Sequence, residues 1–136
     1  MTDHTPPAAA PHTATGWQVL LAPCEPTACT ALQADLADAG ATVICVFDPG
    51  ALAQTLARTP PDLLVMDLRG DCGERLAALE RAQRESPERQ GPVTVGLLDA
   101  ADLPAAAQAP PPVLDALAPA HCTAHELARV AAGQRG

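Results

Sequence analysis

The sequence predicts a three-layer α/β fold in which a five-stranded parallel sheet lies between two layers of helices. Short apolar segments of strand length recur along the chain, and longer segments with helical periodicity separate them. The segment 63–66 (LLVM) is apolar without interruption, which is typical of a strand that is covered on both faces of a parallel sheet. Strands that alternate with helices are joined by right-handed crossovers, and this arrangement favours parallel strands.

The first half of the chain contains three expected strands and two expected helices. Pro23 bounds the first strand, and Gly40 is the expected C-terminal stop of the first helix. A turn signal at 48–50 (DPG) precedes the second helix. The predicted strands cover residues 17–22, 42–47 and 63–67, and the predicted helices cover residues 27–39 and 51–58.

The second half of the chain continues the alternation but has a weak fourth helix. Residues 103–112 hold four prolines, and Pro110 to Pro112 should stop a helix short. In the last helix, Thr123 is the expected N-cap and Glu126 completes a capping box. We expect the flavodoxin-like strand order 2-1-3-4-5. The predicted strands cover residues 92–98 and 113–118, and the clear helices cover 73–85 and 123–132.

Length and composition favour one domain of 136 residues, with a disordered tail over 1–15 and the folded domain over 16–136. The tail is rich in Ala, Pro and Thr and has no apolar period. It lacks the basic start and apolar run of a signal peptide. No segment approaches the roughly 20 apolar residues of a membrane span. We therefore expect a cytoplasmic protein that makes no membrane contact.

The charges disfavour direct binding to nucleic acid. Sixteen acidic residues oppose eight arginines, no lysine is present, and the net charge is −8. Such a surface repels phosphate backbones. The first strand is followed by no glycine-rich loop, so we expect no nucleotide or flavin cofactor. A charged cluster on the third helix is interpreted as a solvated face, and it comprises Glu74, Arg75, Glu80, Arg81, Arg84 and Glu85.

The segment 61–70 (PDLLVMDLRG) places Asp67 at the carboxyl end of the third strand, the edge where open α/β sheets bind ligands. With the segment 126–132 (ELARVAA) and the order of elements, it resembles the response-regulator receiver domain over residues 18–132. The resemblance implies that Asp67 is the phospho-acceptor position. It also implies a protein partner, which could be a regulator, an output domain or a histidine kinase, and a possible homodimer.

The other residues of a receiver site are replaced. Under the resemblance, Pro23 and Cys24 stand where two adjacent acids hold Mg²⁺, and Glu25 follows one step later. Neither proline nor a thiol supplies an oxygen ligand for a hard cation. Leu97 and Pro119 stand at the positions of the Ser/Thr and the Lys that contact the phosphoryl group. Because phosphotransfer depends on electrostatic clamping, we expect a degenerate pseudo-receiver with no bound metal, no cofactor and no enzymatic activity.

Other interpretations of these residues remain open. Asp67 could be a strand-end carboxylate that binds loop amides, a partner contact, or the true acceptor of a single-domain response regulator in a phosphorelay. Cys24, Cys72 and Cys122 follow strands one, three and five, with His121 beside the last. This thiol edge could bind a metal such as zinc, act as a redox switch, or consist of inert thiols. Cys29 and Cys45 are expected to be core residues with no chemistry.

A short fourth helix should leave apolar residues uncovered next to the fifth strand. Exposed apolar patches usually mark partner sites. Ala116 takes the position of the switch aromatic, so binding at this face would not respond to Asp67. The expected interaction face comprises Leu103, Val113, Leu114 and Leu117.

Overall fold

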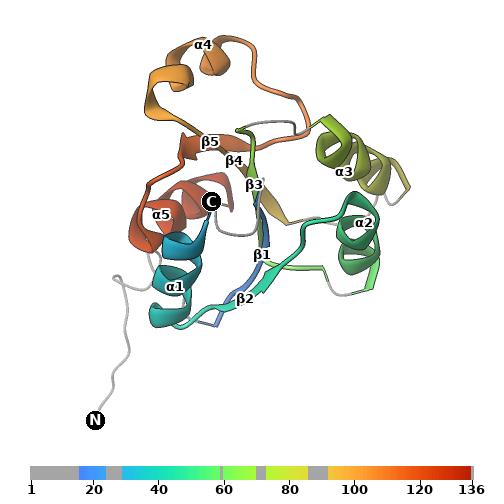
Figure 1. Cartoon of the computed structure of the whole chain (residues 1–136), viewed down its shortest axis with the longest axis horizontal. Helices are drawn as coiled ribbons and strands as arrows, with labels where there is room; N and C mark the ends of the chain where they lie inside the picture. Colours follow the sequence, from blue (N-terminus) through green and yellow to red (C-terminus); the bar gives the residue numbers. More distant parts are fainter. Residues whose placement is uncertain (1–15, 24–28, 59, 70–72, 86–91, 136) are drawn as a thin grey trace.

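The structure is a computed structural model, and it describes residues 16–23, 29–58, 60–69, 73–85 and 92–135. Five parallel strands form one sheet in the order β2-β1-β3-β4-β5, which confirms the predicted flavodoxin-like topology (Figure 1). The predicted disordered tail, 1–15, lies outside the described residues. The strands are β1 (Gln18–Ala22), β2 (Thr42–Cys45), β3 (Leu63–Asp67), β4 (Val93–Leu98) and β5 (Ala116–Pro119).

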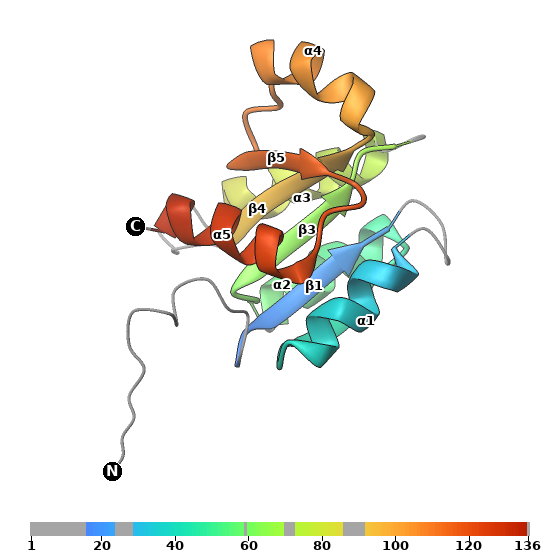
Figure 2. The ribbon, with the colours of Figure 1, turned by 90° about the vertical axis from the view of Figure 1, so that its left-hand side faces the viewer.

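Helices cover both faces of the sheet. The helices α1 and α5 lie on one face, and α2 and α3 lie on the other (Figures 1 and 2). The helix α4 lies beyond β5 and is short, as the prolines around it predicted, and none of its residues is buried. None of the helices in the described part of the chain is long and apolar enough to cross a membrane. The helices are α1 (Thr30–Asp38), α2 (Pro49–Arg58), α3 (Gly73–Glu85), α4 (Leu103–Gln108) and α5 (Ala124–Arg135), and a 3₁₀ turn, Ala100–Asp102, precedes α4.

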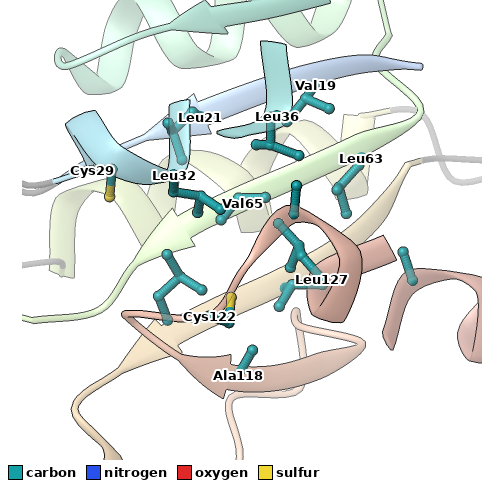
Figure 3. Packing of buried hydrophobic residues seen from close by; sticks show 14 of the residues in the cluster. Val19, Leu21, Cys29, Leu32, Leu36, Leu63, Val65, Ala118, Cys122 and Leu127 are labelled. Carbon is teal, nitrogen blue, oxygen red and sulfur yellow. The ribbon is translucent and has the colours of Figure 1, made fainter. Parts of the chain in front are cut away.

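The central strand β3 is buried along its whole length, as its apolar sequence predicted. Figure 3 shows Leu36 from α1 and Leu127 from α5 packed around Val65 of β3. On the opposite face, Leu52 of α2 and Leu79 of α3 pack in a second apolar cluster. Because both faces of β3 are covered, the carboxyl end of this strand is held in a fixed position.

Local signals place the ends of several helices. Gly40 adopts a positive φ of 96° after α1, which only glycine adopts without strain. The Asp48 side chain accepts a hydrogen bond from the Ala51 N–H at 2.9 Å, and α2 therefore begins at Pro49, two residues before its predicted start. The predicted capping box is present, because the Thr123 N–H donates to Glu126 Oε1 and the Glu126 N–H donates to Thr123 Oγ1.

The close packing around Gly96 of β4 generates a stability prediction. A Cβ atom at this position would lie 2.7 Å from Leu68 Cδ1 and 2.8 Å from Leu114 Cδ1. Overpacking of this kind destabilises a core by about 1–3 kcal/mol, so we expect Gly96→Ala to lower the free energy of unfolding by that amount in urea titrations. Gly133→Ala on α5, where no atom lies within 4 Å of the new Cβ, should be neutral or stabilising. Equal effects of the two substitutions would contradict the packing described here.

Candidate functional site

The candidate site lies at the carboxyl edge of the sheet, where β3 ends at Asp67. Parallel pairing places Asp67 opposite Leu97 of β4 and places Leu98 opposite Pro119 of β5. Asp67 and Leu97 are both fully buried, at 0% exposure. The acceptor position and the two positions expected to carry a hydroxyl and an amine are thus on neighbouring strands, but Leu97 and Pro119 supply only apolar groups there.

Arg69 binds both oxygens of the Asp67 carboxylate. Its Nε donates to Asp67 Oδ1 at 3.0 Å, and its Nη2 donates to Oδ2 at 2.9 Å. The backbone N–H of Arg69 also donates to Oδ1 at 3.0 Å. A bidentate arginine–carboxylate pair is among the stronger polar contacts in proteins. A buried carboxylate without such a partner would be strongly unfavourable, so Arg69 makes the burial of Asp67 possible.

The same guanidinium group reaches outward to Asp99, which follows β4. Arg69 Nη1 lies 3.8 Å from Asp99 Oδ1. The Asp99 side chain is 63% exposed, whereas the Arg69 side chain is 30% exposed. An ion pair at such an exposed position contributes little stability. Asp67 is therefore the dominant partner of Arg69 among the contacts described here.

Cys29 also contacts the Asp67 carboxylate. This residue directly precedes α1 and is 5% exposed, as expected of a core position. Its Sγ donates to Asp67 Oδ2 at 3.6 Å, which is within range for a sulfur donor. Cys29 is thus a core residue as predicted, and its thiol also contacts the carboxylate because the start of α1 lies against the carboxyl edge of the sheet. The loop-amide interpretation of Asp67 is supported by the Arg69 N–H.

Arg75 corrects the interpretation of the third helix as a uniformly solvated charged face. Its side chain is 6% exposed, and Nη1 donates to the carbonyl oxygens of Ala22 at 3.1 Å and Pro23 at 2.7 Å. A helical signal for this burial exists, because Arg75 shares one helix face with Ala78 and Leu79, three and four positions later. Four of the remaining charged residues are exposed as predicted, namely Glu74, Glu80, Arg81 and Arg84.

The position expected for a magnesium-binding acid pair is only partly described. Pro23 is buried, and its carbonyl accepts the Arg75 hydrogen bond. Cys24 and Glu25 lie outside the described residues. Within the described ranges, no three His, Cys, Asp or Glu side chains are grouped closely enough to hold a metal ion.

One half of the predicted thiol edge is visible. Cys122 is 6% exposed, and its neighbour His121 is exposed, while Cys24 and Cys72 lie outside the described residues. Burial, together with the smaller effects of the negative charges of Glu126 and Asp35, raises the pKa of the Cys122 thiol to about 11. The thiol is thus protonated at neutral pH, and a protonated thiol is a poor nucleophile and a poor metal ligand.

The expected interaction face is less exposed than its sequence predicted. Val113 and Leu114 are buried, at 7% and 9% exposure, whereas Leu103 and Leu117 are half-buried. The predicted strand 113–118 begins only at Ala116, because the Leu114 N–H closes a turn on the carbonyl of Pro111 at 3.0 Å. This turn directs Val113 and Leu114 into the core next to α3. The expectation that these two residues are uncovered is therefore wrong.

A hollow of about 640 Å³ lies between β5 and α5. Small and apolar residues form most of its lining, and two charged residues, Glu126 and Arg129, complete it. Glu126 is engaged in the capping box, and the Cys122 thiol at this hollow is protonated.

Comparisons with known proteins agree with this geometry at the level of the fold. No protein-family model and no curated protein sequence matches the chain. A response regulator receiver domain protein from Clostridium thermocellum aligns with a TM-score of 0.65 at 16% identity, over 86% of this chain and 92% of that one. The fold is that of receiver domains.

Longer proteins contain the same fold. NtrX from Brucella abortus, in complex with ATP, aligns at 17% identity with a TM-score of 0.67, over 88% of this chain and 27% of NtrX. Full-length FixJ from B. japonicum aligns at 17% identity with a TM-score of 0.64, over 89% of this chain and 58% of FixJ. The chain therefore spans about a quarter of NtrX and over half of FixJ.

The buried Arg75 gives a test of the site's architecture. Arg75→Met keeps an unbranched stem but leaves the Ala22 and Pro23 carbonyls without this donor. Unsatisfied buried polar groups cost about 1–3 kcal/mol each, so we expect a loss of at least that size in the free energy of unfolding. Arg81→Met, on the exposed side of the same helix, should change stability by less than about 0.5 kcal/mol. A loss at position 81 equal to that at position 75 would show that the carbonyl contacts are unimportant.

The raised pKa of Cys122 predicts slow thiol chemistry. A thiol with a pKa of about 11 has a thiolate fraction near pH 8 that is about 100-fold smaller than that of a thiol with the ordinary pKa of 9.0. Cys122 should therefore react with iodoacetamide at least that much more slowly than a cysteine in an unfolded peptide, as measured by peptide mass mapping. Urea should abolish the protection. Rapid alkylation of Cys122 in the native protein would support the thiol-edge hypothesis instead.

Proposed function

We propose that this chain is a non-enzymatic, receiver-like regulatory module that acts by binding other proteins, without phosphorylation of Asp67. The observation that carries the proposal is the Arg69–Asp67 ion pair, in which one guanidinium contacts both oxygens of a carboxylate with no exposed surface. An acceptor aspartate must present an oxygen to the phosphodonor. Here an attack by Asp67 would require the guanidinium to move away and leave a buried charge behind.

Within the part of the chain that the structure describes, the surroundings of Asp67 supply few of the groups that stabilise a transferred phosphoryl group. Positively charged or hydrogen-bonding groups must surround its oxygens as charge develops. Leu97 is opposite Asp67, and Pro119 follows on the next strand, so neither position offers a hydroxyl or an amine. Arg69 is a cation, but it is committed to the carboxylate itself. These features favour a site with one permanent charge state over a site that cycles with phosphate.

The partner in this proposal is a protein in the cytoplasm, which could be a regulator, an output domain, a histidine kinase or a second copy of this chain. The net charge of −8 disfavours nucleic acid as the direct target. A working single-domain response regulator that is phosphorylated on Asp67 is the alternative, and it makes the opposite prediction in the following experiment.

Incubation with acetyl phosphate and Mg²⁺, followed by intact mass measurement, tests the proposal. We expect no added phosphate, because Leu97 and Pro119 supply neither a hydroxyl nor an amine. We also expect calorimetry to detect no Mg²⁺ binding in the millimolar range, because Pro23 and Cys24 supply no oxygen ligand from their side chains. An active receiver domain serves as the positive control, and Asp67→Asn serves as the site control. A gain of one phosphate that is absent from Asp67→Asn would overturn the proposal.

A further inference from the structure

The large apolar side chains that remain exposed in the described residues lie at β2, not at the expected face next to β5. Ile44 is 44% exposed, and Phe47, just after the strand, is 49% exposed. Phe47 is also the single phenylalanine of the chain. Ile44 is in register with Leu20 of β1, so it lies on the α2 side of the sheet. Aromatic side chains are enriched in protein interfaces.

The outer edge of β2 also presents main-chain hydrogen-bonding groups. The Thr42 N–H donates to the Trp17 carbonyl and the Val46 N–H donates to the Leu21 carbonyl, so the even-numbered residues face β1. Alternation along a strand then directs the N–H and C=O groups of Val43 and Cys45 away from β1. Figure 1 shows β2 at one end of the sheet with no helix or strand on its outer side. Among the described elements, β1 is thus the only strand that pairs with β2.

The two edges of the sheet differ in protection. At the opposite edge, β5 ends in Pro119, and α4 lies beyond this strand (Figure 1). Proline and covering elements are common devices that prevent pairing at a sheet edge. In contrast, residues 42–47 contain no proline and no charged side chain. The β2 edge lacks both of these devices. An unprotected edge usually promotes association with another strand.

We propose that β2 pairs with β2 of a second copy of this chain, in antiparallel orientation about a two-fold axis at Ile44. The outward groups of Val43 and Cys45 are placed symmetrically about Ile44. A two-fold operation therefore sets Val43 of one copy opposite Cys45 of the other, and each such pair exchanges two hydrogen bonds. The two Ile44 side chains then meet at the centre, in a non-hydrogen-bonded pair. The inference deepens the proposed function, since it rests on a protein-binding role and names the partner as a second copy.

Charge and size determine the expected strength of this dimer. The strand of four residues buries less than the roughly 1,600 Å² of a standard interface, so the dimer should be weak. Each copy carries a net charge of −8, and the two copies repel each other at long range. Salt screens this repulsion, whereas the contact itself is uncharged. Association should therefore become tighter as salt is added.

Sedimentation velocity of the full chain over a range of concentrations tests the proposal. We expect a reversible dimer that is stronger at high salt. Ile44→Glu should weaken association by about tenfold or more, with circular dichroism and thermal unfolding as checks of the fold. Gln108→Glu adds the same charge on α4, near the opposite edge, and should dimerise like the wild type. A monomeric wild type, or equal dimerisation of both variants, would overturn the proposal.

Cysteine cross-linking tests the register independently of affinity. In the proposed pair the Ile44 Cα atoms lie about 4.5 Å apart, and a disulfide can span that distance. Ile44→Cys should form a reducible dimer under mild oxidation, above the wild-type background from the five native cysteines. Thr42→Cys, on the same strand but opposite residue 46 of the other copy, should not. Equal cross-linking of both variants would exclude this register. Neither test involves Asp67. A negative result in either test would therefore leave the proposed absence of phosphorylation unaffected.

Discussion

Burial of the Asp67 carboxylate at the end of the central strand requires a cation beside it. Both faces of β3 are covered by helices, so the strand delivers this carboxylate to a position without solvent contact. Arg69, two residues later, satisfies both oxygens and closes the strand end on itself. The carboxylate therefore cannot pair with Arg69 through both oxygens and be open to a phosphodonor at the same time. The contacts of Asp67 favour compensation of its charge by Arg69.

The rest of the edge is arranged around the same constraint. Cys29, before α1, donates to Asp67, and Arg75, from α3, donates to the end of β1. Helices on opposite faces of the sheet thus each contribute a donor to neighbouring strand ends. Main-chain carbonyls at a strand end need donors once they are buried, and a long arginine side chain can reach them from a helix. Polar groups at this edge are consequently bound to one another, which favours a single fixed arrangement.

The positions of the strands followed from the sequence because apolar runs and turn residues are local signals. The order of the sheet followed from the alternation of strands and helices, which is typical of the flavodoxin-like class. The limits of α3, Gly73–Glu85, also followed from its periodicity. The start of β5 did not, since Val113 and Leu114 resemble a strand in sequence but lie in a turn that the Thr94 hydroxyl and the Val113 carbonyl help to hold. Arg75 was predicted to lie on a solvated face, and no role was predicted for Arg69. Arg75 reaches main-chain carbonyls that are distant in sequence, and the pairing of Arg69 with Asp67 depends on burial that only packing reveals.

A double-mutant cycle between Arg69 and Asp67 measures the central interaction most directly. Urea unfolding of Arg69→Met, Asp67→Asn and the double variant gives the coupling free energy of the pair. We expect Arg69→Met to lose about 3–5 kcal/mol, because it leaves a buried charge uncompensated. The double variant should lose less than the sum of the two single losses, by at least about 1 kcal/mol. Losses that add to within about 0.5 kcal/mol would contradict a structural ion pair at the acceptor position.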